Sequence, residues 1–199
     1  MTDSDFRSAD DLRDRLGIIL IAQYGSLAEI LPTIPSDWLV ETLKKGRLKA
    51  ARSGTEKARS EWLIAPILTE VEDAHQHIAI FSGRPLRAGD LAGTPDFVFA
   101  AASGGKTIER PIVAVVEAKR DDFEYGAAQC VAAMAAAHKL NQTNQLVGGA
   151  VTNGTSWQFL DLVSSTQAQI DEQIYTLEDL PTILGVFHWF CIREPQGIS

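Results

Sequence analysis

The sequence predicts an α/β fold, in which a mixed β-sheet is flanked by helices and a helical extension precedes it. Residues 1–75 carry apolar side chains at helical spacing. Residues 77–163 instead hold short β-rich or apolar runs that Gly, Asn and Ser separate. An alanine-rich helical stretch, residues 125–140, interrupts these runs. Because strand–helix–strand order requires a crossover, the sheet should contain parallel as well as antiparallel pairs.

Residues 1–52 form the predicted helical extension. Ser8 is an N-cap residue type, and the apolar spacing after it predicts a helix over residues 9–27. The proline-containing stretch 31–36 ends this helix. A second helix is expected directly after Ser36, which is again an N-cap residue type.

Residues 53–199 form the predicted main domain, which ends in a helix. Ser53 and Glu56 have the spacing of a capping box, so a third helix should start there. Pro66 should kink or break that helix, because proline lacks the backbone N–H that a helix interior needs. The last helix is expected after Thr176. Five strands are expected between these helices, at residues 77–83, 96–102, 111–118, 145–152 and 156–163.

Composition favours a soluble globular protein of one domain. The chain has 199 residues, of which 45% are hydrophobic and 22% are charged. No apolar run approaches the ~20 residues that cross a bilayer, and the polar, acidic first residues are unlike a secretory signal. Cys130 and Cys191 lie in apolar segments without metal-ligand spacing, which is typical of reduced core cysteines. These features predict a cytoplasmic protein without membrane contact.

The charge distribution contains a basic segment within an acidic protein. The net charge of −8 by itself disfavours a polyanionic partner. Residues 44–59, however, hold seven of the eighteen Lys and Arg and only one acid, Glu56. Such a run is either a solvated helix face or a surface that contacts phosphates. The candidate nucleic-acid-binding residues are Lys44, Lys45, Arg47, Lys49 and Arg52.

A charged pair ends the most apolar predicted strand. In PIVAVVEAK, residues 111–119, Glu117 and Lys119 lie on one face of the strand and Ala118 on the other. The preceding strand starts at Asp96, and the glycines between the two strands predict a hairpin. With the hairpin centred near residues 106–107, Asp96 lies opposite Glu117, where side chains are about 5 Å apart.

Two carboxylates at that separation repel each other unless a proton or a cation lies between them. Mg²⁺ is suited to such a place, since it prefers oxygen ligands and accepts one or two carboxylates with waters and substrate phosphate. Lys119 lies one pleat further on, where it would orient a water molecule or stabilise developing negative charge. The sequence therefore predicts a metal-dependent site at the strand end.

These residues resemble the PD-(D/E)XK nuclease superfamily, which has a restriction-endonuclease-like fold. GTPDFVF matches the first half of that motif at Asp96, and VVEAKR matches the second half at Glu117 and Lys119. GGAVTNGTSWQFLDL, residues 148–162, resembles the strand pair in N-terminal nuclease domains of type I restriction motor subunits. The resemblance covers about residues 53–163.

The resemblance also implies accessory residues. The family places a helix before its first strand, often with a further metal-associated acid, for which Glu61 is the best match and Glu56 and Glu70 are alternatives. Gln129 resembles a glutamine in the helix after the motif. Some branches have a tyrosine four residues after that glutamine, where this chain has Ala133.

The function that the resemblance implies is hydrolysis of phosphodiester bonds in nucleic acid, most readily DNA. Asp96, Glu117 and Glu61 would hold Mg²⁺, or Mn²⁺ as a substitute, with a backbone carbonyl near Ala118. Lys119 would position the attacking water. One such domain has one active site, so double-strand cleavage would need a homodimer or two binding events. The alternative is a binding or assembly module of the same fold with vestigial acids.

His75 and His77 alternate across the start of a predicted strand. Because no Cys and no third His lies nearby in the sequence, we interpret them as a strand entrance rather than as metal ligands.

Overall fold

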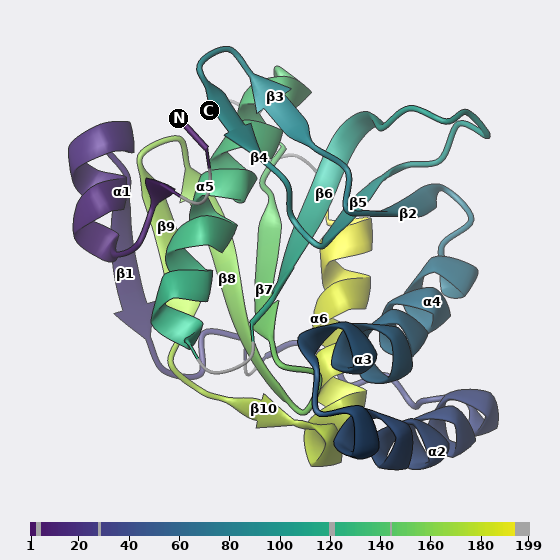
Figure 1. Ribbon diagram of the computed structural model, residues 1–199. Helices are drawn as coiled ribbons and strands as arrows, with labels where there is room; N and C mark the ends of the chain where they lie inside the picture. Colours follow the sequence, from purple (N-terminus) through teal and green to yellow (C-terminus); the bar gives the residue numbers. More distant parts are fainter. Residues whose placement is uncertain (3–4, 28, 120–121, 144, 194–199) are drawn as a thin grey trace.

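The computed structural model describes residues 1–2, 5–27, 29–119, 122–143 and 145–193 (Figure 1). In this part of the chain, an eight-stranded sheet has the order β1-β9-β8-β7-β6-β5-β2, and β10 pairs with β8. Its strands are β1 (Ile19–Gln23), β2 (Ile78–Ser82), β5 (Phe97–Ala101), β6 (Glu109–Ala118), β7 (Gly148–Thr152), β8 (Ser156–Ser164), β9 (Gln167–Asp171) and β10 (Tyr175–Thr176). A separate hairpin consists of β3 (Leu86–Ala88) and β4 (Leu91–Gly93).

The sheet is mixed, as the strand–helix–strand order predicts. β6 and β7 are parallel, and so are β1 and β9. The pairs β2–β5, β5–β6, β7–β8 and β8–β9 are antiparallel. The α/β class with a mixed sheet flanked by helices is therefore confirmed.

Helices cover both faces of the sheet. They are α1 (Ala9–Leu16), α2 (Asp37–Ser53), α3 (Glu56–Arg59), the π-helical turn η2 (Ser60–Ile64), α4 (Ala65–Ala74), α5 (Phe123–Asn141), the 3-10 turn η3 (Leu177–Asp179) and α6 (Leu180–Ile192). α1, α5 and the β3–β4 hairpin lie over one face, and α4 and α6 lie over the other (Figure 1). Each face consequently has its own apolar core, one rich in alanine from α5 and one rich in aromatic side chains from α6.

The five predicted strands correspond to β2, β5, β6, β7 and β8, and the predicted alanine-rich helix corresponds to α5. The last predicted helix corresponds to η3 and α6, and Thr176 caps its start by accepting a hydrogen bond from Glu178 N–H. Alternating or continuous apolar runs thus locate these strands well, because burial of their side chains is what stabilises them.

The predicted helix over residues 9–27 is wrong beyond Leu16. Gly17 has a φ of 68°, and its N–H donates to the Arg13 carbonyl, which ends α1 in a left-handed cap. Residues 19–23 then form β1, an edge strand parallel to β9. β-branched isoleucines favour this extended conformation. Residues 1–52 are therefore not a purely helical extension, because they contribute a strand to the main sheet.

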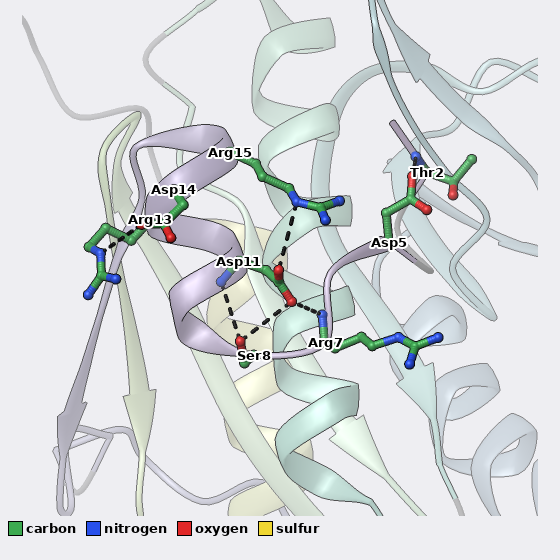
Figure 2. A network of polar contacts seen from close by, with 8 residues as sticks. All are labelled: Thr2, Asp5, Arg7, Ser8, Asp11, Arg13, Asp14 and Arg15. Carbon is green, nitrogen blue, oxygen red and sulfur yellow. Dashed lines mark hydrogen bonds and ion pairs between the residues drawn. The ribbon is translucent and has the colours of Figure 1, made fainter.

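Ser8 is the N-cap of α1, as expected. Its hydroxyl accepts a hydrogen bond from Asp11 N–H at 3.3 Å (Figure 2). The Asp11 carboxylate in turn accepts from Arg7 N–H at 2.9 Å, and Arg15 Nε lies 3.7 Å from it. These contacts satisfy helix-end donors that would otherwise lack partners.

The third predicted helix begins later than its capping-box spacing suggests. Ser53 is the last residue of α2, and Thr55 caps α3 by accepting from Ala58 N–H at 3.1 Å. The break expected at Pro66 takes the form of η2, which ends two residues before this proline.

Pro66 has no N–H to offer the Trp62 carbonyl four residues earlier. Gly46 of α2 packs closely against that carbonyl, where a Cβ would collide with it. This close approach fixes α2 against η2.

Besides β1, four of the described strands are not predicted by the sequence: β3, β4, β9 and β10. β3 and β4 have three residues each and β10 has two, which is too short for a recognisable alternation. β9 has the sequence QAQID, and its three polar side chains obscure the pattern.

Candidate functional site

Asp96 and Glu117 face each other at the end of neighbouring strands. β5 and β6 pair antiparallel with Phe97 opposite Val116, so the next step of the same register places Asp96 opposite Glu117. Register shifts in this pair occur only beyond Phe99, toward the hairpin loop. The pairing predicted from the hairpin count is thus confirmed at the site, where the two side chains share one position along the ladder.

Both acids project toward α5. Val98 of β5 and Val115 of β6 belong to the core under this helix, and alternate residues of a strand share a face. Lys119 lies on the same side, since a Cβ at Gly126 of α5 would be 2.8 Å from Lys119 Cγ. Ala118 is buried in the opposite core. The face predicted for Glu117 and Lys119 is therefore confirmed.

Direct contacts hold this group together. Ala118 N–H donates to Asp96 Oδ2 at 2.7 Å, and Lys119 Nζ lies 3.6 Å from Glu117 Oε2. The side chain of Glu117 is 4% exposed and that of Lys119 is 22% exposed. A buried carboxylate is tolerated when opposite charge or hydrogen-bond donors accompany it, and the Lys119 ammonium supplies such a charge.

α5 adds two polar side chains one turn apart. Gln129 Nε2 donates to the Tyr125 hydroxyl at 3.1 Å, and Lys119 Nζ lies 5.8 Å from the centre of the Tyr125 ring. Gln129 Oε1 is buried and accepts no hydrogen bond from the described residues. Gln129 is therefore linked to Lys119 through Tyr125, which precedes it in the helix.

Tyr125 is not predicted by the sequence, because the resemblance implies a tyrosine four residues after Gln129 and none before it. Ala133, at that position, is fully buried in the core. Tyr125 stands four residues before Gln129, and that spacing also places two side chains on one helix face.

The Glu117 carboxylate exerts an electrostatic effect on α5. Burial first, and the charge of Glu117 second, raise the pKa of the Cys130 thiol well above its ordinary value. Cys130 is consequently a protonated core residue, in line with its interpretation as reduced and structural.

Glu61 does not join the two acids. It lies in η2, its side chain is 53% exposed, and its carboxylate is 3.8 Å from Lys57 Nζ. Of the alternatives, Glu56 is exposed in the first turn of α3, and Glu70 accepts hydrogen bonds from the backbone N–H and the hydroxyl of Ser36. Among the residues that the structure describes, no three His, Cys, Asp or Glu form a group that could hold a metal ion.

The remaining donors fit a metal ion that keeps much of its water. Asp96 and Glu117 supply two carboxylates on one face, which is the number of protein ligands that Mg²⁺ commonly takes beside waters and phosphate. These two carboxylates do not fit an ion that needs all of its ligands from the protein.

The five candidate cations of the basic segment lie on α2, and their side chains are all exposed. Lys44 lies 3.7 Å from Glu41, and Lys49 Nζ lies 3.8 Å from the centre of the Trp62 ring. In the part of the chain that the structure describes, Lys45, Arg47 and Arg52 form no ion pair.

The segment reaches the sheet end through η2. A Cβ at Gly154 in the β7–β8 turn would lie 3.2 Å from Leu63 of η2 and 3.4 Å from Arg59 of α3. The carbonyl of Thr152, before that turn, accepts a hydrogen bond from Lys119 N–H. Thus η2 connects the basic helix to the strand end that carries the acids.

A second polar cluster forms where sequence reasoning expected only a strand entrance. His75 Nε2 lies 2.6 Å from Nδ1 of His188, which α6 contributes, and the His75 and His77 rings are 5.6 Å apart. A third histidine is therefore nearby in space, although it is 113 residues away in the sequence.

No family model and no curated protein matches this chain by sequence. Within the described residues, no helix is long and apolar enough to cross a membrane.

Proposed function

We propose that this protein is a metal-dependent nuclease that hydrolyses phosphodiester bonds of nucleic acid, with DNA as its substrate. The observation that carries the proposal is the meeting of Asp96, Glu117 and Lys119 on one face of the sheet, with 3.6 Å between Glu117 Oε2 and Lys119 Nζ. Two acids and a lysine at adjoining strand ends suit a reaction in which negative charge develops on a phosphate.

Asp96 and Glu117, with the backbone carbonyl of Ala118, would hold Mg²⁺, for which Mn²⁺ would substitute. When bound, the ion polarises the phosphate and lowers the pKa of water. The Ala118 N–H fixes one carboxylate oxygen of Asp96, so this ligand is oriented before the ion arrives. Such preorganisation reduces the entropy lost on binding.

Lys119 would orient the attacking water and stabilise charge on the phosphate. Its position is restricted on two sides, by Gly126 against its Cγ and by the Tyr125 ring 5.8 Å from its Nζ. The hydrogen bond from Gln129 fixes the Tyr125 hydroxyl in turn. We assign Tyr125 and Gln129 as positioning residues for Lys119.

The order of elements also supports the proposal. α4, β2, β5, β6, α5, β7 and β8 occur in this order, with the β3–β4 hairpin inserted between β2 and β5. Asp96 directly precedes β5 and Glu117 lies on β6, as the PD-(D/E)XK resemblance implies. Lys45, Lys49 and Arg52, which are exposed on one side of α2, would contact backbone phosphates, which makes binding dependent on salt.

A binding module of the same fold is the second candidate. It is favoured by one observation, namely that Glu61 pairs with Lys57 and does not complete an acidic cluster among the described residues. A measurement of DNA cleavage distinguishes the nuclease from the binding module.

The test compares the parent protein with Lys119→Ala, Glu117→Gln and the control Lys106→Ala. Lys106 is exposed in the loop between β5 and β6. Single-turnover cleavage of circular single- and double-stranded DNA is measured with Mg²⁺, Mn²⁺ or EDTA. Lys119→Ala should slow cleavage at least about 100-fold while metal affinity is retained, because a group that acts on a proton or charge in the transition state contributes about that much.

Glu117→Gln should lose cleavage together with metal affinity in calorimetric titration, and Lys106→Ala should behave like the parent. Cleavage by Lys119→Ala at the parental rate would contradict the assigned role of this lysine. A parent that binds no divalent ion and cleaves no DNA, yet binds it, would make the module the better assignment.

A further inference from the structure

A cavity of about 590 Å³ lies at the other end of the sheet from the acids. Residues of the β3–β4 hairpin, the start of β6 and the last turn of α5 line it. Arg110 in this wall and Glu117 are seven residues apart on β6, which corresponds to roughly 23 Å along a strand. The cavity is therefore separate from the candidate metal site.

Three cations surround this cavity, Arg87, Arg110 and Lys139, and no acid is among the described residues that line it. None of the three forms an ion pair with a described carboxylate. In a chain with a net charge of −8, three cations around one cavity whose described lining holds no acid are a local reversal of sign. Such a place attracts anions.

Uncharged backbone adjoins two of these cations, and one of them donates a hydrogen bond to it. Arg110 Nη1 donates to the Leu140 carbonyl at 3.1 Å, which orients the guanidinium and leaves its charge uncompensated. Lys139 Nζ lies beside the β3–β4 turn, where a Cβ at Gly89 would be 3.5 Å away. Gly89 has a φ of 63°, which favours glycine and permits this close approach.

One part of the cavity wall is apolar. Leu86 and Ile112 are buried, and Ile108 and Leu140 are half-buried beside them. The volume is within the range of pockets for small organic ligands, and the planar guanidinium of Arg110 can stack on a ring. A neighbouring cavity of about 580 Å³ shares Lys139 but is lined by Asp90 as well, so it is less suited to an anion.

We propose that the 590 Å³ cavity binds a small phosphate ester with a ring-shaped body, of the kind that a nucleoside diphosphate represents. The phosphates lie against Arg87, Arg110 and Lys139, and the ring lies against the apolar wall. This assignment does not rest on the nuclease proposal.

Calorimetry with three probes tests the ligand class: ADP, adenosine and pyrophosphate. The titrations contain EDTA, so that no divalent ion links a phosphate to Asp96 and Glu117. ADP should bind more tightly than either pyrophosphate, which lacks the ring, or adenosine, which lacks the charge. Glu117→Gln should bind ADP like the parent, which separates this site from the proposed nuclease site.

Variants test the location. Arg87→Gln, Arg110→Gln and Lys139→Gln should each weaken ADP binding about fivefold, the effect of one partly exposed ion pair. Because all three side chains are exposed, these variants should fold. Lys106→Gln, which removes a cation outside the cavity, should leave the affinity unchanged.

Three results would overturn the proposal. One is that ADP shows no binding at millimolar concentration. Another is that pyrophosphate or adenosine binds as tightly as ADP. The third is that the three cavity variants bind ADP as tightly as the parent does, or that Lys106→Gln weakens ADP binding as much as the cavity variants do.

Discussion

Two buried carboxylates in this sheet, those of Asp171 and Glu117, have different kinds of partner. Asp171 is 1% exposed and accepts hydrogen bonds from Gly25 N–H, Gln173 N–H and the Tyr175 hydroxyl, which joins the loop after β1 to β9 and β10. Burial, followed by the Asp171 charge, raises the pKa of Tyr175. All these partners are structural.

Glu117 is 3% exposed, and its ion-pair partner Lys119 is itself partly open to solvent at the end of the strand. This accessibility makes Glu117 a candidate site residue, whereas Asp171 belongs to a buried network.

The histidine pair predicts a loss of stability in acid. Burial first, then the charges of His188 and His77, lower the pKa of His75, and burial lowers the pKa of His188 despite the opposing charge of Glu70. The unfolded chain therefore binds more protons than the folded protein below about pH 6.5. The contribution of the pair is complete above that pH and decreases as the pH falls toward the lower folded-state values.

Urea unfolding at about pH 7.5 and about pH 5.5 measures this effect. The variant His75→Gln/His188→Gln should lose less stability between the two pH values than the parent. Gln76→Ala, an exposed and uncharged neighbour, is the control and should match the parent. An equal loss in the parent and the double variant would refute the assignment.

At the scale of elements, α2 carries its cations on two sides. Lys45, Lys49 and Arg52 follow each other at i+4 and i+3 spacing, so they share one side. Lys49 contacts Trp62 of η2, so this side borders the element that leads to the Lys119 strand end. Arg47 lies on the other side, next to the exposed Leu48.

This arrangement predicts unequal effects on DNA binding. In Ca²⁺, Lys45→Ala/Arg52→Ala should reduce the slope of log K against log salt by roughly 1.8 for duplex DNA, because each lost phosphate contact accounts for about 0.9. Arg47→Ala is the matched control within the same helix and should change the slope little. Equal slopes for all three proteins would show that α2 is only a solvated face.

The sequence was sufficient for the elements whose pattern reflects burial. The apolar runs locate β2, β5, β6, β7 and β8, and the hairpin count gives the Asp96–Glu117 register, because antiparallel neighbours joined by a loop share a centre. It was insufficient for β1, since Ile19 and Leu20 continue the helical spacing of α1 by chance and only Gly17 marks its end.

The same limit applies to the site. Asp96, Glu117 and Lys119 are predictable from two neighbouring strands. Tyr125 and Gln129 depend on how α5 crosses the sheet, and Glu61 depends on the π-helical turn that Pro66 follows. His188 approaches His75 only through the packing of α6 on α4. Such long-range packing has no signature in local periodicity.

At the scale of the whole molecule, residues 1–52 are part of the fold. Phe6, Leu12, Ile18, Leu39 and Leu43 are all buried. Fully burying one such side chain stabilises a protein by about 1.5–3 kcal/mol, so these five are comparable with the whole stability of a domain, roughly 5–15 kcal/mol.

Residues 53–199 alone should therefore fail to fold cooperatively. Circular dichroism during thermal and urea unfolding, with the full chain as the reference, measures this. A fragment that unfolds at the midpoint of the full chain would show that the first 52 residues are dispensable.

The pairing of β1 with β9 also affects how the chain is made. Ile19 pairs with Gln167, so the edge of the sheet is completed only after about 150 further residues have been synthesised. At ~5–20 residues per second this takes roughly 7–30 s, during which Ile19, Leu20 and Ile21 have no strand to pair with. The nascent chain thus displays an unpaired apolar strand while it is still on the ribosome, and this interval is when aggregation competes with folding.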